Sequence, residues 1–451
     1  MTKKQDSKVK KKIIKKPSGK RKVSIKTTKK PKVIFTSKNK NTNKKVIKQK
    51  DKIKNEIKPR VKKTGKLKSL AKKIVDTLKG GVKKITKKSS PSLKKKITKK
   101  VLKKDKNETV LPKEGIKLSR AYANPIIEPR LYSWESKATF NPTAFSSNGK
   151  IHLIYRAVGW DDISVLGYAS SFNGYKIEER PPYHIYRRFS KTEPIGPKVD
   201  YGSGGGWSGG CEDPRITLVG DRLYMLYTAF DGWSSVRIAL TSISLEDFKK
   251  HHWDKWENPV LISPPGEINK NWVIFPEKIN GKFAIMHSFY PNILIDYFDN
   301  LDHFDGTKFI KSNNTRPVDK TRGWDSWFRG VGPAPMKIKE GWLVLYHAMD
   351  HKNPDRYKMG ALILDGKDPT KILYRSSHPI LEPEEHYENN GHKWGVVYSC
   401  GAIIKEGRLF VYYGGADTVV CVASIPVTEL VDHLKKNKII KLQNDKIVKT
   451  K

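Results

Sequence analysis

Five copies of one strand pattern run through this chain between residues 148 and 413. Each copy is a two-residue turn followed by a run of β-branched and aromatic residues that ends near Tyr or His. The copies occupy residues 148–155, 220–227, 280–287, 340–347 and 406–413. Their second turn residues are 72, 60, 60 and 66 positions apart. Periods of this size in strand-rich sequence are typical of propeller blades.

Each copy is flanked in the same way. A short segment with Pro or Gly precedes each turn, and a strand of small residues follows it. The preceding segments contain Asn141-Pro142, Asp213-Pro214, Phe275-Pro276, Ala334-Pro335 and Cys400-Gly401. A hairpin with further strands makes one four-stranded blade, and five blades in a ring leave no long sheet edge exposed. We therefore predict an all-β fold, a five-bladed β-propeller over residues 116–432.

Composition divides the chain near residue 110. Residues 1–110 contain 42 Lys and 2 Arg against 6 acidic residues, which is +38 of the net charge of +45, and one aromatic residue, Phe35. A segment with so much like charge and so few large apolar groups cannot bury a core. The sequence therefore predicts a disordered Lys-rich tail over residues 1–115 and a short basic tail over residues 433–451.

The long tail has the charge to bind polyanions. Many ammonium groups and almost no aromatic residues favour non-specific binding to nucleic acid or another anionic surface through counterion release. Residues 66–79 show apolar positions at helical spacing among lysines, a pattern that indicates a basic amphipathic helix. A solvated tail without a partner, with at most a transient helix, is the alternative.

Cysteine content and hydropathy bear on the compartment. The three cysteines, Cys211, Cys400 and Cys421, are too few and too scattered for a disulfide framework or a Cys-rich metal site. The sequence has no run of 18 apolar residues and no apolar stretch at its N-terminus. These features favour a cytoplasmic protein, and no cluster of metal ligands is visible.

Polar residues lie in the segments that precede the repeated turns. In a propeller the first strand of each blade lines the central channel, so these segments should face one axis. Their polar members are Asn141, Glu212, Asp213, Arg215, Glu277 and Lys278. Charged groups that converge in a concavity indicate a ligand site. A simple pair of Asp213 and Arg215 across a blade turn is the alternative.

Ordered motifs identify a resemblance. They are NPIIEP at 124–129, FNPTA at 140–144, CEDPRIT at 211–217, FPEK at 275–278, HPILEP at 378–383 and YGGAD at 413–417. Together they resemble glycoside hydrolase family 130, the mannoside phosphorylases and related mannosidases, across residues 123–430. The family fold is a five-bladed propeller, in agreement with the repeat count.

The resemblance implies roles for individual residues. Asp213 matches the general acid that protonates the departing sugar, and Arg237, Lys278 and His287 match residues that contact phosphate. Asn141, Arg156, Asp161, Arg215 and Asp417 are implied in the sugar site, although Asp161 also suits an ordinary blade turn. The implied reaction is inverting phosphorolysis of β-1,2- or β-1,4-linked manno-oligosaccharides to α-mannose 1-phosphate. It needs phosphate as co-substrate and no metal or other cofactor.

The sequence departs from the family pattern near the site. A Gly-rich insert spans residues 202–210, Ser288 stands where Arg is common, and residues 324–330 replace a segment that usually contains Lys. The last two changes remove expected cations.

Two other functions stay open at this stage. One is hydrolysis of the same bond, with Glu212 or Glu277 as the base. The other is a polyanion-binding protein with a glycan-binding propeller, and a homo-oligomer is compatible with each function.

Overall fold

The computed structural model describes residues 115–187, 209–230, 236–312, 318–320 and 323–437. All of these residues lie within the unit Asn107–Lys451. The predictions for the Lys-rich tail up to residue 114, for the helix at 66–79, for residues 202–208 of the Gly-rich insert and for residues 438–451 lie outside the described residues.

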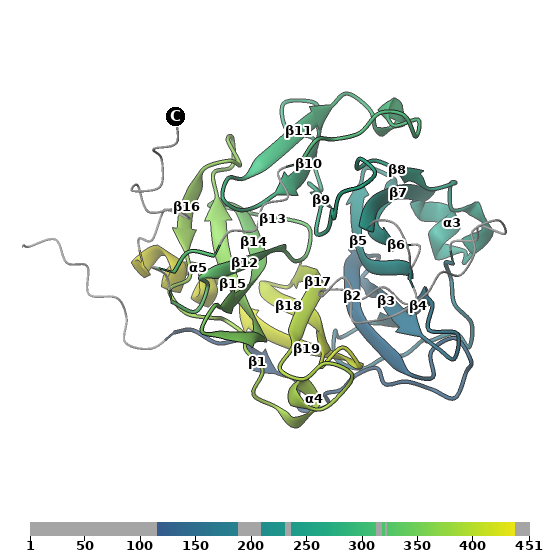
Figure 1. The fold of residues 1–451 in the computed structure, drawn as a ribbon, viewed down its shortest axis with the longest axis horizontal. Coiled ribbons are helices and arrows are strands. Elements are labelled where there is room, and N and C mark those ends of the chain that lie inside the picture. Colours follow the sequence, from purple (N-terminus) through teal and green to yellow (C-terminus); the bar gives the residue numbers. More distant parts are fainter. Residues whose placement is uncertain (1–114, 188–208, 231–235, 313–317, 321–322, 438–451) are drawn as a thin grey trace, which may run out of the picture. The chain divides into compact units, whose positions relative to one another are not determined.

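Antiparallel strands dominate the described residues (Figure 1), which confirms the predicted all-β class. They form five successive units. The first contains β2 (Ala138–Ser147), β3 (Lys150–Val158) and β4 (Ser164–Ser171). The second contains β5 (Gly210–Val219), β6 (Arg222–Phe230), β7 (Val236–Ser244) and β8 (Val260–Leu261). One parallel pairing, of Ser164 with Gly210, joins these two units into one sheet.

The other three units follow the same meander. The third contains β9 (Val273–Ile274), β10 (Phe283–Ser288) and β11 (Leu294–Phe298). The fourth contains β12 (Trp327–Val331), β13 (Met336–Ile338), β14 (Gly341–Asp350), β15 (Asn353–Leu364) and β16 (Ile372–Arg375). The fifth contains β17 (Val397–Lys405), β18 (Arg408–Gly415) and β19 (Val419–Pro426). Strand β1 (Ser119–Arg120), from ahead of the first unit, pairs with β19 and so adds a fourth strand to the sheet of the fifth unit.

Short helices connect the strands. They are α3 (Leu245–Lys249), η2 (Trp253–Lys255), η3 (Leu301–His303), α4 (His386–Asn389) and α5 (Val427–Asn437). Helix α5 buries Leu430, Val431 and Leu434 in the core shared by the fourth and fifth units. Because this apolar face continues past residue 432, the folded part extends beyond the predicted boundary. In the described part of the chain, no helix has the length and apolar character that crossing a lipid bilayer would require.

The repeated turns have the backbone conformation that their residues favour. Asn148 and Gly149 have φ of 52° and 73°, and Asn280 and Gly281 have φ of 52° and 77°. Two successive left-handed residues suit the two-residue turn of a hairpin, and Asn and Gly are the residues that adopt this conformation most easily. The turn dipeptides therefore set the register between the two strands that each of them connects.

Hydrogen bonds connect each unit to the next and the fifth unit to the first. They run from Ile216 N to Thr143 Oγ1 (2.9 Å), from Thr217 Oγ1 to Ile274 O (3.2 Å), from Asn271 Nδ2 to Arg329 O (2.8 Å), from Ser399 N to His347 Nε2 (3.0 Å) and from Thr139 N to Thr418 O (3.0 Å). Apolar clusters fill the space between neighbouring sheets, as where Phe275 packs on Trp342. The first strands of the units therefore lie close to one another.

The first strands of four units have irregular pairing near their starts. The register shifts between Phe140 and Thr143 in β2, between Glu212 and Arg215 in β5, between Phe328 and Gly330 in β12, and between Tyr398 and Gly401 in β17. A bulge re-aims the side chain that it carries. In β2 and β5 the re-aimed residues are Asn141 and Asp213, with φ of 47° and 50°.

Candidate active site

Asp213 is the centre of a buried polar cluster. Its Oδ1 accepts hydrogen bonds from Asn141 Nδ2 at 2.9 Å and from Arg156 Nη1 at 3.2 Å. Lys270 Nζ lies 3.7 Å from its Oδ2, and the side chain of Asp213 is only 4% exposed. One carboxylate thus lies against two cations and an amide donor, each from a different strand or segment.

Arg156 connects the first two units at this cluster. It lies on β3, opposite Phe140, and its guanidinium packs over the Phe140 ring. Its Nη2 donates to Glu212 Oε1 at 2.8 Å and its Nε donates to Ser164 Oγ at 2.9 Å. The two carboxylates of Glu212 and Asp213 therefore share one buried guanidinium.

The two aspartates of the site have pKa values that are shifted in opposite directions. Burial alone would raise the pKa of Asp213, but the charges of Lys270, Arg156 and Arg215 hold this pKa well below its usual range. Burial raises the pKa of Asp417, against the opposing charges of Lys393 and Arg156. Asp213 is therefore ionised at neutral pH while the site contains no anion.

Arg215 joins the inner segments. It is buried and donates to Gly332 O (3.0 Å), Asn271 Oδ1 (2.9 Å), Tyr398 OH (3.0 Å) and its neighbour Asp213 O (3.1 Å). The resemblance implies a sugar contact for Arg215. The structure instead shows a guanidinium that binds protein acceptors on four segments, and so fixes the backbone that carries Asp213.

His347 and Tyr398 complete the buried floor around Arg215. Their rings stack with centroids 4.2 Å apart and planes 9° apart. Burial, with a further contribution from the Arg215 charge, lowers the pKa of His347 to about 3. The ring is therefore neutral, and its Nε2 accepts the amide hydrogen of Ser399. Sequence reasoning missed this pair because neither residue lies in one of the motifs that carry the family resemblance.

Cations from the third and fourth units lie on adjacent segments. Lys270 and Arg329 are each 9% exposed. The side chain of Asn271, the residue after Lys270, donates a hydrogen bond to the backbone carbonyl of Arg329 and so connects the two segments. The Arg329 guanidinium lies over the ring of Trp327, and its Nε donates to Tyr357 OH at 2.7 Å. Arg329 thus supplies a cation in the segment from which the family lysine is missing.

Comparison with known proteins identifies the family. The family model described as beta-1,4-mannooligosaccharide phosphorylase matches residues 110–436. The chain belongs to glycoside hydrolase family 130. Among the residues that the structure describes, no group of three or more His, Cys, Asp and Glu side chains could hold a metal ion.

Two phosphorylases are similar to this chain over most of their own length. A 1,2-beta-oligomannan phosphorylase from Thermoanaerobacter sp. strain X514 is 37% identical over 327 residues, which is 70% of this chain and 99% of the relative. A beta-1,4-mannooligosaccharide phosphorylase from Ruminococcus albus is 28% identical over 70% of this chain and 90% of the relative.

A solved structure in family 130 has the same fold. The structure of a beta-1,2-mannobiose phosphorylase from Listeria innocua, in complex with beta-1,2-mannobiose, is 26% identical in sequence. It superposes with a TM-score of 0.55, and the superposition covers 71% of this chain and 99% of the Listeria chain.

The family resemblance implies that Lys278 binds phosphate. In the structure Lys278 does not belong to the Asp213 cluster. Its side chain is exposed, and its Nζ lies over the ring of Phe283 and 3.5 Å from Asp299 O. The reason is the short strand β9, whose pairing with β10 ends at Ile274. Lys278 lies beyond that end, next to the hairpin turn at 280–281, and Lys270 occupies the position beside Asp213.

Arg237 and His287 lie on strands farther along their units. Arg237 is on β7, where its Nε donates to Ser263 O at 2.9 Å and its guanidinium lies over Phe309. His287 is buried on β10, with its ring against Trp272 and its Nε2 3.6 Å from Asp296. Burial lowers the pKa of His287, opposed by Asp296. Each of the three implied phosphate residues thus lies beside different protein partners, and of the three the side chain of Lys278 is the exposed one.

Two acidic residues that the sequence placed in the site, Asp161 and Glu277, lie outside the Asp213 cluster. Asp161 is 44% exposed, accepts from Ile163 N and pairs with Arg187, which fits the blade-turn interpretation rather than a sugar contact. Glu277 is 53% exposed and pairs with Lys337 at 2.8 Å. The structure brings together Asn141, Arg156 and Asp213, while Asp417 is buried close enough to interact electrostatically with Arg156 and Asp213.

Proposed function

We propose that the protein is an inverting phosphorylase of β-mannosides, which transfers a mannosyl group to inorganic phosphate and releases α-mannose 1-phosphate. The observation that carries the proposal is the buried Asp213 carboxylate with Lys270 at 3.7 Å. A proton donor and an anion site are the two components that phosphorolysis requires. The phosphorylase names of the relatives from Thermoanaerobacter, Ruminococcus and Listeria support this reaction.

The proposed chemistry uses one protein carboxyl group. Asp213 donates a proton to the oxygen of the departing sugar as the bond between that oxygen and the anomeric carbon breaks. An oxygen of phosphate attacks the anomeric carbon from the opposite face, which inverts its configuration. Phosphate is already an anion, so no second carboxylate is needed as a base.

The positions of the charged groups divide the site into two parts. We assign phosphate to Lys270 and Arg329, because both cations are largely buried, Lys270 lies 3.7 Å from Asp213, and Asn271 beside Lys270 bonds to Arg329 O. We assign the mannosyl ring to Asn141 and Arg156, which bind the other oxygen of the acid, and to Asp417, whose charge interacts with those of Arg156 and Asp213. Arg237, Lys278 and His287 are the competing phosphate set.

The fold that supports this site is a five-bladed β-propeller. The hydrogen bonds that connect each unit to the next, and the fifth to the first, support a closed ring of five blades. Strand β1 beside β19 supplies the outer strand of the last blade. The likeness to the Listeria phosphorylase structure supports the same architecture.

Hydrolysis is the less favoured reaction. A hydrolase needs a carboxylate that can activate water. Glu277 is exposed and paired with Lys337, and Glu212 is fully buried with its carboxylate on Arg156. Neither group is placed as a base for water at the Asp213 cluster.

The test is to incubate the full chain with β-1,2- and β-1,4-mannobiose, with and without phosphate. We expect mannose 1-phosphate as the product and turnover only when phosphate is present. Arsenate should replace phosphate and give free mannose, because the arsenate ester hydrolyses. Free mannose at an undiminished rate in buffer without phosphate or arsenate would contradict the proposal.

Proton uptake provides an independent prediction. Phosphate next to Lys270 would neutralise the charge that holds the pKa of Asp213 low, so this pKa should rise when phosphate binds. Asp213 ionised in the free site would then take up a proton, and phosphate binding should strengthen as the pH falls. Titration calorimetry in buffers of different ionisation enthalpy measures this uptake.

The matched control for proton uptake is Asp213→Asn, which cannot take up the proton. The difference in proton number between the parent protein and this variant removes the contribution of phosphate itself. Equal proton numbers in the two proteins would show that Asp213 does not titrate with phosphate binding.

Two further expectations stay proposals. We propose a cytoplasmic location, supported by a cysteine content of three, which is too low for a disulfide framework. We also propose that the Lys-rich segment binds polyanions, which its excess of Lys over acidic residues supports.

A further inference from the structure

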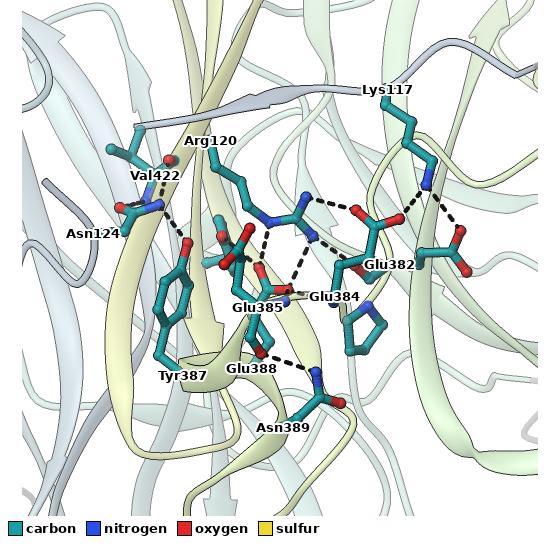
Figure 2. Close-up of polar contacts among 12 residues, drawn as sticks. Lys117, Arg120, Asn124, Glu382, Glu384, Glu385, Tyr387, Glu388, Asn389 and Val422 are labelled. Atoms are coloured by element: carbon teal, nitrogen blue, oxygen red, sulfur yellow. Dashed lines mark hydrogen bonds and ion pairs between the residues drawn. The ribbon is translucent and has the colours of Figure 1, made fainter. Parts of the chain in front are cut away.

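One carboxylate outside the Asp213 cluster has hydrogen-bond partners on both of its oxygens. Glu388 on α4 is fully buried, and its Oε1 accepts from Arg120 Nε at 2.7 Å and from Tyr413 OH at 2.7 Å. Its Oε2 accepts from Arg120 Nη2 at 2.9 Å and from the amides of Glu384 and Glu385. Figure 2 shows the Arg120 guanidinium lying between Glu384 and Glu388.

Arg120 comes from a part of the chain that precedes the first unit. It lies on β1, paired with Ala423 of β19, and its partner Glu388 is 268 positions away in the sequence. Its Nη2 also donates to Glu382 O, and neighbouring Lys117 pairs with Glu382 and Glu384. Strand β1 is therefore attached to the segment around α4 by charge as well as by its sheet pairing (Figure 2).

The segment that Glu388 anchors contacts the turn that carries Asp417. The carbonyl of Glu388 accepts from Gly395 N and Val396 N, which closes the loop after α4. That loop then bonds to the turn between β18 and β19. The bonds are Lys393 N to Ala416 O, Ala416 N to Val396 O, and His392 N to Thr418 Oγ1. Tyr413, which binds the Glu388 carboxylate, lies on the strand that leads into this turn.

The turn itself needs support from its surroundings. Ala416 and Asp417 both have φ of 49°, a left-handed conformation that non-glycine residues adopt only when neighbouring contacts fix it. The loop approaches so closely that a Cβ at Gly391 would lie 2.4 Å from Thr418 Oγ1. The loop that Glu388 holds is thus packed closely against the turn that carries Asp417 and supplies part of the contacts that fix it.

We propose that the Arg120–Glu388 pair is a positioning device for Asp417, through which strand β1 controls the affinity of the sugar subsite. The inference rests on the proposed function, in which Asp417 contacts the mannosyl ring. A buried ion pair adds little stability compared with apolar side chains of the same shape, and its best-supported role is to fix geometry. Arg120, Glu388 and Tyr413 touch no substrate in this arrangement, so they are positioning residues.

The test compares Arg120→Met, Arg120→Lys and Glu388→Gln with the parent chain. Arg120→Met and Glu388→Gln should raise the KM for mannobiose about tenfold and leave the KM for phosphate within about twofold, because a displaced Asp417 weakens only the sugar contact. Arg120→Lys should recover part of the loss. Tyr413→Phe removes one hydrogen bond and should raise the sugar KM by a smaller factor, which keeps the test decisive if the other variants do not fold.

The matched control is Arg375→Met. Arg375 makes a buried ion pair with Asp325 at 2.6 Å, on the outer strand β16 and away from the Asp417 turn. This variant should lower the melting temperature without changing the sugar KM. A sugar KM that stays at the parent value in folded Arg120→Met and Glu388→Gln would overturn the proposal, and so would an equal rise in Arg375→Met.

A second readout needs no turnover. Amide hydrogen exchange over residues 391–418 should be faster in Arg120→Met than in the parent, and unchanged in Arg375→Met. If the parent chain did not cleave mannobiose, the proposed function would fail, and this exchange measurement would still decide whether the pair orders the Asp417 turn. Exchange at the parent rate in that region would overturn the positioning role.

Discussion

Replacing Asp213 by Asn is expected to lower kcat for mannobiose by roughly 10²–10⁴-fold, the usual contribution of a general acid. The amide has nearly the same shape and can accept from Asn141 and Arg156, so the fold should stay intact. The effect should shrink on a mannoside with a good leaving group, because such a group departs without protonation. Steady-state kinetics on mannobiose and on an aryl mannoside measure both effects.

The control for this prediction is Asp417→Asn. Asp417 is the other buried aspartate of the site, and burial raises its pKa. If it binds the sugar, its variant should raise the KM for mannobiose and lower kcat far less than Asp213→Asn does. A larger loss of kcat in Asp417→Asn, with a strong dependence on the leaving group, would assign the acid to Asp417 instead.

The pKa shifts explain why this control is needed. Environments that push two carboxyl groups in opposite directions usually distinguish the acid from the base. Without phosphate, the cations around Asp213 favour its ionised form, which is unsuited to an acid. Our assignment therefore requires that phosphate binding cancels the Lys270 charge, and the proton-uptake measurement tests that requirement directly.

The repeat in the sequence predicted the class of fold and part of the site. Asn141 and Asp213 could be found because each is followed by Pro at the same point before a repeated turn, and both prove to lie at bulges of first strands. The same alignment placed Glu277 and Lys278 in the channel. It failed there because β9 has only two residues, so the residue that reaches Asp213 lies earlier, at Lys270.

Other parts of the site leave no mark in a single sequence. Arg120 and Glu388 are 268 positions apart, and neither belongs to a repeated segment, so only the folded chain brings them together. Arg329 lies in a segment that lacks the expected Lys, yet its guanidinium, over Trp327, supplies the charge. A change of residue type at one position can thus be offset by a neighbouring side chain that sequence comparison does not align.

The position of Lys270 beside Asp213 predicts a large effect on the KM for phosphate. Lys270→Met is expected to raise the KM for phosphate by about one to two orders of magnitude, since a buried charge-assisted contact contributes roughly 1.5–3 kcal/mol. The sugar KM should change much less. Asp213 can tolerate the loss of the Lys270 charge because its pKa then rises and the carboxyl group can protonate, instead of remaining as an unpaired buried charge.

Lys278→Met is the matched variant, because it removes the same group eight positions along the chain, where the side chain is exposed over Phe283. Its phosphate KM should stay within about twofold of the parent value. The two lysines thereby distinguish the site that the structure assembles from the one that the family resemblance implies. A large rise in phosphate KM for Lys278→Met, with Lys270→Met unaffected, would move the phosphate to the Arg237, Lys278 and His287 set, and Lys270 would then serve only to hold the charge of Asp213.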